Sequence, residues 1–388
     1  MAEQKEVVKK GIKNILYVIS FFDKRDGAST AINYQSTIDK DFYDDYLIVC
    51  KWKGETLPNL KIVCIDGNES VIKDFLSQGR VIIHYYKATN SNVFQRICKM
   101  AGKDVPKLMT VCQNPSYTQY LLSPIEIREA WKIVFIDKTS YNNPIHSFIS
   151  EEKKLQIYLS GKWNVEATKN VQWPNNTPYV VYGRGSTLSK CPKQMFEVFD
   201  KIDIPKKKFV IVGIPEGDNW VRKEARKRDN VIVYDKLSRE EWFNICTTFD
   251  IFLYHLPEYS HSSIDGTLGL AMLMRHPVVY MGCEAPKERM HHGINGFVAN
   301  NIEELSSYAT ILGKDKILRR KMGQAARDTT ISDFSPEVRK QKYVMAYNSL
   351  QENIKVQIPF TYYLKFLRRC YKSIIRSIFN IYSSTIDF

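Results

Sequence analysis

The stretch 261–300 holds the residues whose types and spacing are best suited to chemistry. Ser262, Ser263 and Asp265 precede an apolar run over 268–274, which predicts a polar loop followed by a buried helix. Pro277 then introduces a buried strand. In an open parallel sheet this order makes a helix N-terminus face the carboxyl end of a strand, where unpaired N–H groups and a partial positive charge attract phosphate. The stretch therefore predicts an anion site.

The rest of the chain supplies the alternating elements that such a site needs. A polar, proline-punctuated stretch at 161–178 predicts a connection between two domains, each a doubly wound α/β fold. Ser238, with Glu241 three residues later, predicts a capped helix in the second domain. Strands are expected at 14–20, 46–50, 61–65, 81–85, 107–112, 133–136, 179–182, 209–212, 231–234, 249–254 and 278–280, and late helices at 302–312, 316–326 and 336–353.

The same stretch resembles the nucleotide-sugar site of GT-B fold glycosyltransferases, most closely the large retaining family GT4. The resemblance is strong over 179–350 and weaker over 14–140, and it implies two Rossmann-like domains facing a cleft. The two glutamates of the family's E-x7-E motif fall on Ser262 and Leu270, so both carboxylates are missing at their expected positions. The family's spacing is kept at Ala271-Met272, Pro277-Val278-Val279, Glu288, Gly293, Asn295 and Gly296.

A second motif lies where the second domain begins. Gly183-Arg184 and Lys190 resemble the family's G-R-x(4)-K-G signature, with one extra residue before Lys190 and Cys191 in place of the second glycine. The resemblance implies that Arg184 and Lys190 grip the diphosphate and stabilise its charge as it leaves. The alternative is a solvated basic loop.

The resemblance also implies which other residues contact the donor. Glu288 is the expected contact to the sugar hydroxyls. Gly27 would let the backbone approach the donor or acceptor, or it belongs to an ordinary Asp-Gly turn. Asp265 either contributes to the site or caps the helix and occupies the amides that a phosphate needs. The donor-side set is Gly27, Gly183, Gly213, Asp235, Lys236, Ser262, Ser263, Asp265, Gly266 and Thr267.

Two residues at strand ends of the first domain are the expected acceptor-side contacts. His84 closes an apolar strand, and Gln113 follows the strand at 107–112, where the family often has a histidine. A neutral amide can orient a hydroxyl but is a poor base. A lone histidine beside two tyrosines is often a hydrogen-bonded core residue. Two interpretations of His84 therefore stay open: a contact to the acceptor and a residue of the core.

Composition narrows the class of protein and its partners. The 388 residues are 44% hydrophobic and 12% aromatic, enough to fill two cores. A net charge of +14 indicates an anionic partner, but no nucleic-acid module is recognised, so nucleic acid is not expected. Eight cysteines without CxxC spacing and a Lys-rich start without a signal peptide predict free thiols in the cytosol. No apolar run approaches the ~20 residues that cross a bilayer.

The tail at 358–388 differs in kind from the rest of the chain. Its aromatic and aliphatic residues and its cations have helical spacing, and Asp387 is its only acid. The pattern suits a helix on an anionic membrane surface, with a helix packed on the body or on a second subunit as the alternative. The apolar face is expected to comprise Tyr363, Phe366, Leu367, Ile374, Ile375 and Ile378, and the cations are Lys365, Arg368, Arg369, Lys372 and Arg376.

These patterns predict a glycosyltransferase that moves a sugar from a nucleotide-diphosphate donor to a glycan or lipid-linked acceptor in cell-surface polysaccharide biosynthesis. The resemblance implies retention of configuration, no metal and no cofactor besides the donor. A non-catalytic partner subunit or glycan-binding protein is the alternative. The expected location is cytoplasmic, at the inner face of the membrane, and the oligomeric state is left open. The expected parts are an acceptor-side domain at 1–165, a nucleotide-sugar domain at 166–335, a crossover helix at 336–357 and the membrane-associating tail at 358–388.

Overall fold

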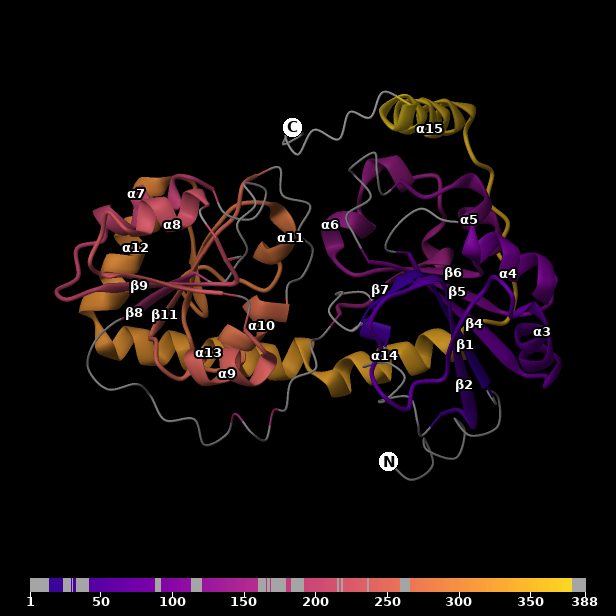
Figure 1. Ribbon diagram of the computed structural model, residues 1–388, viewed down its shortest axis with the longest axis horizontal. Coiled ribbons are helices and arrows are strands. Elements are labelled where there is room, and N and C mark those ends of the chain that lie inside the picture. The colour runs from indigo at the N-terminus through magenta and orange to yellow at the C-terminus, as the bar shows by residue number, and fades with distance from the viewer. Residues whose placement is uncertain are drawn as a thin grey trace. The chain divides into compact units, whose positions relative to one another are not determined.

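A computed structural model gives the fold of the protein as two compact units (Figure 1). Unit 1 comprises Met1–Lys162 and Pro336–Ser384, and the main part of unit 2 is Trp163–Ser335. The first division falls three residues before the one expected after residue 165, and the second falls at 335/336. The described residues are 14–23, 29, 31–32, 42–87, 92–112, 121–159, 165, 168, 179–182, 192–214, 216–217, 219–235, 237–258 and 266–378, without the side chains of 179–182, 239 and 373–378.

Unit 1 is built on a seven-stranded parallel sheet of order β3-β2-β1-β4-β5-β6-β7. The order makes β1 and β4 neighbours at the point where the winding reverses. Ligands of open α/β sheets bind outside the carboxyl ends of the strands at such a point. The strands are β1 Asn14–Phe22, β2 Asp45–Lys53, β3 Ile62–Cys64, β4 Val81–Lys87, β5 Lys107–Val111, β6 Lys132–Phe135 and β7 Lys154–Gln156.

The continuous apolar character of β1 reflects burial on both faces of this sheet. Successive side chains of a strand point to opposite faces, so Ile15, Tyr17 and Ile19 enter one hydrophobic cluster while Leu16 and Val18 enter another. The first cluster lies under α14 (Pro336–Asn348). The second lies under α3 (Glu69–Ser77), α4 (Val93–Ala101) and α5 (Pro124–Glu129). Shorter pieces are α6 Lys138–Tyr141, η3 Pro144–His146 and η4 Glu151–Lys153.

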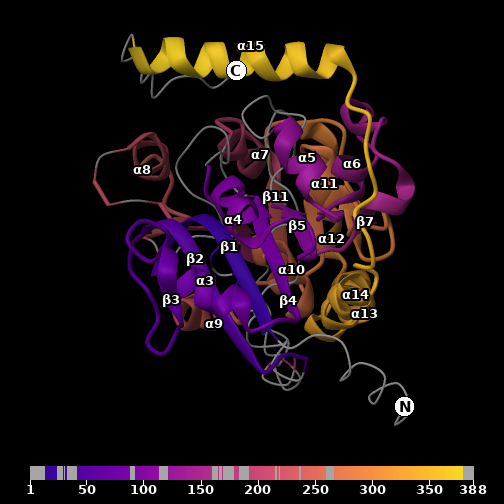
Figure 2. The same ribbon diagram turned by 90° about the vertical axis from the view of Figure 1, so that its right-hand side faces the viewer.

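The helix that returns to unit 1 is shorter than expected. α14 ends at Asn348, and no helix continues to residue 353 as the sequence predicted. Beyond the end of the helix, the buried ammonium of Lys153 donates to Asn353 Oδ1 at 2.9 Å and to the Ile354 carbonyl at 2.7 Å. Those contacts hold the chain in a non-helical path. The segment 349–359 is therefore a strap that runs from α14 to the last helix (Figure 2).

Unit 2 repeats the same topology with six parallel strands in the order β10-β9-β8-β11-β12-β13. The predicted α/β class with parallel sheets is thus confirmed in both units. β13 is not among the strands predicted from the sequence, because Gly296-Phe297-Val298 is not a run of three apolar residues. The strands are β8 Tyr179–Tyr182, β9 Lys208–Val212, β10 Val231–Tyr234, β11 Ile251–His255, β12 Val278–Met281 and β13 Gly296–Val298.

The helices of unit 2 cover both faces of its sheet. The predicted capping box at the start of α9 is confirmed: Ser238 Oγ accepts from the Glu241 amide at 3.2 Å, and Glu241 Oε2 accepts from the Ser238 amide at 2.7 Å. α13 runs to Phe334, past the predicted end at 326, because its last turn is anchored by the buried Phe334 ring. The helices are α7 Met195–Lys201, α8 Trp220–Ala225, α9 Arg239–Cys246, α10 Gly266–Leu273, α11 Glu284–Lys287, α12 Ile302–Lys314 and α13 Lys316–Phe334.

The last helix, α15 (Phe360–Ile378), packs on unit 1, where the Tyr362 hydroxyl donates to the Leu122 carbonyl just before α5. Tyr362 and Phe366 join the cluster under α3, α4 and α5, whereas Leu367 is 59% exposed. The predicted apolar face, which put Phe366 and Leu367 together, is therefore wrong. Apolar residues lie on more than one side of the helix. The side that carries Tyr362 is buried, because Tyr362 packs in this cluster and its hydroxyl donates to the Leu122 carbonyl. In the part of the chain that the structure describes, no helix is long and apolar enough to cross a bilayer.

Candidate active site

The expected donor site lies along the carboxyl edge of the sheet in unit 2. In sequence, Gly183-Arg184 follow β8 directly, Gly213 follows β9 and Asp235 follows β10. The chain then passes from β11 through 256–265 into α10. β8 and β11 are neighbours at the winding reversal, which is the place where ligands bind in sheets of this order. The topology thus brings residues from separate motifs to one edge.

Gly213 and Asp235 form a fixed turn at this edge. Gly213 has a φ of +87°, which favours glycine, and its N–H donates to the carbonyls of Tyr234 at 3.2 Å and Asp235 at 3.1 Å. The Asp235 carboxylate forms an ion pair with Arg222, whose guanidinium also donates to the Ile214 carbonyl at 3.2 Å. Arg222 therefore ties the ends of β9 and β10 together. Sequence reasoning missed this role, because a charge in a basic run gives no sign of its partner.

α10 brings a helix N-terminus to the same edge. Residues 268–273 are all buried, so the helix is fixed by its apolar surroundings, as the apolar run predicted. Gly266 and Thr267 are its first two residues, and a Cβ at Gly266 would meet nothing within 4 Å. Leu270, where the family's second glutamate would fall, is only 9% exposed and packs in the core of unit 2. A ribose contact cannot come from that position.

The loop between β12 and β13 positions Glu288. Glu288 is half-buried just after α11, and its amide donates to the Ala285 carbonyl at 3.3 Å. Asn295 is fully buried and closes the loop: its Nδ2 donates to the Arg289 carbonyl at 3.0 Å, and its Oδ1 accepts from the His291 amide at 2.7 Å. These matched residues thus shape the loop that carries Glu288.

Two glycines allow this loop to approach its neighbours closely. Gly282 has a φ of +142°, and a Cβ there would lie 2.5 Å from the Leu256 carbonyl oxygen. A Cβ at Gly296 would lie 2.5 Å from the Val278 carbonyl oxygen. A side chain at Gly282 would push the loop away from the end of β11, and a side chain at Gly296 would push β13 away from β12. Gly296, which the resemblance singled out, is therefore needed for close backbone packing.

The remaining predicted contacts lie outside the described residues. They are Gly27, Gln113, Gly183, Arg184, Lys190, Lys236, Ser262, Ser263 and Asp265.

His84 lies in the core of unit 1. It is fully buried, with Nδ1 2.8 Å from the Tyr347 hydroxyl and Nε2 2.8 Å from Thr110 Oγ1. Burial, helped by the nearby charge of Arg339, lowers the pKa of His84 well below its usual value, so the ring is neutral at pH 7. These contacts match the interpretation of a hydrogen-bonded core residue that joins β4 and β5 to α14.

We expect His84→Leu to act on stability. The change removes the hydrogen bonds of the ring to the hydroxyls of Thr110 and Tyr347, although Thr110 Oγ1 keeps its contact with the Tyr343 hydroxyl at 3.0 Å. The loss should cost about 1–3 kcal/mol of unfolding free energy. Urea denaturation measures the loss, and Tyr347→Phe, which removes one partner only, should cost less. Donor hydrolysis per folded molecule should stay within about twofold. An unchanged stability with lost acceptor transfer would return His84 to the acceptor site.

Sequence reasoning also missed a buried ion pair at the carboxyl end of β4. Lys87 Nζ lies 2.8 Å from Glu126 Oε1, and both side chains are almost completely buried. Glu126 also caps α5, since its Oε2 accepts from the Ser123 amide at 2.7 Å. Ser123 followed by Glu126 has the capping-box spacing and could have been found. The pairing with Lys87 depends on the fold.

Several solved structures resemble this fold, and glycosyltransferases are among them. HepE from Anabaena, in complex with UDP, matches with a TM-score of 0.67 at 14% identity, covering 87% of this chain and 100% of that chain. A glycosyltransferase from Rickettsia africae matches with a TM-score of 0.67 at 17% identity, covering 88% and 100%. Sucrose-phosphate synthase from Thermosynechococcus elongatus matches with a TM-score of 0.64 at 11% identity, covering 87% and 99%.

These likenesses confirm the predicted GT-B fold over most of the chain. At such low identity they define the fold. No protein-family model and no curated protein matches the sequence. HepE has further structures with UDP and glucose and with UDP-glucose.

Proposed function

We propose that this protein is a glycosyltransferase that transfers a sugar from a nucleoside-diphosphate donor to a glycan or lipid-linked acceptor. One observation carries the proposal: the chain has the fold of proteins such as HepE, whose structures contain UDP and UDP-glucose. In the sequence, the residues of the resemblance in unit 2 follow strand ends at one edge of its sheet. We further propose a hexosyl donor, retention, no metal requirement and a place in cell-surface polysaccharide synthesis at the inner membrane face.

The protein's part in this reaction is to stabilise the departing diphosphate. Negative charge grows on the leaving group as the bond to the sugar breaks, so cations and oriented N–H groups act most strongly in the transition state. Arg184 and Lys190 would supply the cations, and the N-terminus of α10 would supply the amides. Glu288 would hold the sugar hydroxyls, since its loop is fixed by Asn295. No cofactor besides the donor is needed.

The missing E-x7-E glutamates require another contact to the ribose. Glu258 is a candidate because it is exposed and follows β11, one of the two strands at the winding reversal. Asp265 is the other candidate from the sequence. Their asparagine variants would separate a ribose contact, which lowers donor affinity, from a helix cap, which lowers melting temperature.

Titration and hydrolysis of a panel of nucleotide sugars test the function. We expect the purified protein to bind at least one nucleoside diphosphate and to hydrolyse its sugar derivative slowly without an acceptor. Binding of no nucleotide sugar in the panel would overturn the proposal. Binding without hydrolysis or transfer would instead favour the alternative, a non-catalytic partner subunit or glycan-binding protein, to which the lost glutamates at Ser262 and Leu270 point.

Glu288→Gln is expected to lower turnover about tenfold. The substitution keeps the shape but replaces a charged acceptor of sugar hydrogen bonds by a neutral one, a loss of about 1.4 kcal/mol in the transition state. Initial rates of donor hydrolysis measure it. Glu284→Gln is the matched control, since Glu284 lies in the same loop but is exposed and pairs with Lys287 at 2.6 Å. Equal effects of the two variants would remove Glu288 from the site.

A further inference from the structure

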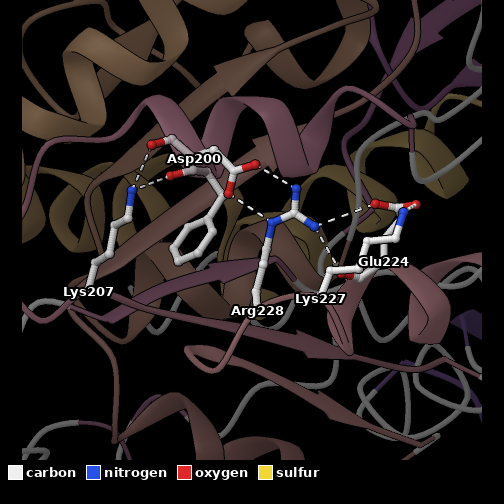
Figure 3. Close-up of polar contacts among 6 residues, drawn as sticks. Asp200, Lys207, Glu224, Lys227 and Arg228 are labelled. Carbon is white, nitrogen blue, oxygen red and sulfur yellow. Dashed lines mark hydrogen bonds and ion pairs between the residues drawn. The ribbon is translucent and has the colours of Figure 1, made fainter.

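Several cations of unit 2 make contacts within that unit. Arg228 lies between Asp200 and Glu224 (Figure 3), with Nε 2.8 Å from Asp200 Oδ1 and Nη1 2.9 Å from the Glu224 carbonyl. Lys207 donates to the carbonyls of Phe199 at 2.6 Å and Asp200 at 3.0 Å, at the end of α7. Together with Arg222, these cations stabilise the fold. The basic runs of unit 2 therefore give little support to an anion-binding surface.

The cations of α15 are different. Lys365, Arg368 and Lys372 are exposed, and among the described residues none of them pairs with an acidic side chain. The helix contains no Asp or Glu. Such a helix attracts an anionic surface, and its attraction is not cancelled by its own carboxylates.

An apolar stripe runs along the outward side of the same helix. Phe360, Leu364, Leu367 and Tyr371 are spaced four, three and four residues apart, so they lie on one face. They are 74%, 42%, 59% and 66% exposed, although large apolar side chains are normally covered when they gather in one patch. Lys365, Arg368 and Lys372 flank this outer stripe. The combination of exposed apolar residues with flanking cations is typical of helices that lie in a membrane interface.

The opposite side of α15 is anchored to unit 1. Tyr362 is buried, and its hydroxyl donates to the Leu122 carbonyl at 2.8 Å, while the buried Arg369 guanidinium donates to the Leu121 carbonyl. Leu121 and Leu122 precede α5, which carries Glu126, the partner of Lys87 at the carboxyl end of β4. The helix is thus held beside the edge of the sheet where unit 1 is expected to bind its acceptor.

We propose that α15 is a membrane-docking helix that inserts the outer stripe, Phe360, Leu364, Leu367 and Tyr371, into the interface of an anionic bilayer. Its inner face keeps the acceptor edge of unit 1 close to that bilayer, so the acceptor is a lipid-linked molecule taken from the membrane surface. The identity of the acceptor rests on the proposed function, whereas the membrane contact does not.

Co-sedimentation of the full chain with vesicles tests the contact. Vesicles that contain phosphatidylglycerol should retain the protein at low salt, lose much of it at about 0.5 M salt, and bind far more than pure phosphatidylcholine vesicles. Leu364→Glu/Leu367→Glu should abolish sedimentation. Lys365→Gln/Arg368→Gln/Lys372→Gln should weaken binding about 100-fold, since each basic residue near such a surface contributes about a factor of five.

Matched variants control for charge, exposure and folding. Ile317→Glu/Met345→Glu puts the same charges at residues that are 82% and 70% exposed elsewhere, and Lys73→Gln/Lys99→Gln/Lys321→Gln removes three exposed cations from other helices. Both should bind vesicles like the unchanged protein. Equal binding by Leu364→Glu/Leu367→Glu and the unchanged protein would overturn the proposal. A dimer in sedimentation velocity that this double variant dissolves would also overturn it in favour of a second copy of the chain.

Donor binding separates this proposal from the proposed function. Titration with UDP should give the same affinity for the unchanged protein and the α15 variants, because the donor motifs lie in unit 2. Vesicle binding without any nucleotide binding would overturn the proposed glycosyltransferase function and support the membrane-docking role of α15. Nucleotide binding without vesicle binding would overturn the membrane-docking role and support the proposed function.

Discussion

Replacing both Arg184 and Lys190 by alanine is expected to lower turnover by about 100-fold or more, with little change in folding. The two cations would face the diphosphate, whose charge grows as it leaves, so their loss raises the barrier more than it weakens ground-state binding. A factor of 100 corresponds to about 2.7 kcal/mol of transition-state stabilisation. Single-turnover rates with a saturating donor measure the change in the chemical step.

The controls for this prediction concern charge and fold. Lys99→Ala/Lys321→Ala removes two exposed cations elsewhere and should leave the rate unchanged. The single variant Arg184→Lys should be faster than the double alanine variant but slower than the unchanged protein. The reason is that an ammonium cannot reproduce the two parallel hydrogen bonds of a guanidinium. Melting temperature shows whether the alanine variant is folded. Full turnover in a folded Arg184→Ala/Lys190→Ala protein would refute the assignment of the donor site and favour a solvated basic loop.

Glu126→Gln is expected to destabilise unit 1 by about 3–5 kcal/mol, the cost of leaving one member of a buried ion pair without its partner. Lys87 and Glu126 are each about 3% exposed, and their charged atoms lie 2.8 Å apart. Burial lowers the pKa of Lys87, and Glu126 opposes that effect. Without the carboxylate, the positive charge of Arg369 would act on Lys87 without the opposing charge of Glu126. Guanidinium denaturation followed by circular dichroism measures the loss.

A double variant identifies the cause. Lys87→Met/Glu126→Gln removes both charges, so it should lose less stability than Glu126→Gln alone. Asp45→Asn is the surface control: its partner Lys61 is 57% exposed, and such pairs contribute at most about 1 kcal/mol. If the double variant were less stable than Glu126→Gln by the full effect of Lys87→Met, the two charges would not be coupled. The buried pair would then have no part in holding α5 to β4.

The strands illustrate what could be predicted from the sequence. Because both sheets are parallel and covered on both faces, their strands are continuous apolar runs, and β1, β4, β9 and β11 stand out from their surroundings. The start of α9 was equally visible, since a capping box depends on side chains three residues apart. Local spacing therefore recovers elements whose cause is local. The three-residue strands β7 and β13 contain no run of three apolar residues, whereas the equally short β3 does and was predicted.

The candidate site also combines features that the sequence predicts with contacts that only the fold creates. The order of strand, loop and helix around α10 was visible in the sequence, and the observed winding order brings the carboxyl ends of β8 and β11 together. The partner of Asp235 was not visible in the sequence, because Arg222 lies in α8 and meets Asp235 only when β9 and β10 pair. The hydrogen bond between His84 and Tyr347 could not be predicted from the sequence either, since the two residues are 263 positions apart in the chain.

The sequence by itself determined the class of fold, the two-part organisation of the chain and the amphipathic, basic character of its last helix. These features follow from hydrophobic period and composition, which are local properties. Only the tertiary structure decided which side of α15 faces the protein. Apolar residues surround most of that helix, and the carbonyls of Leu121 and Leu122 select Tyr362 and Arg369 for the inner face. Contacts between distant segments are decided by folding, because no spacing along the chain encodes them.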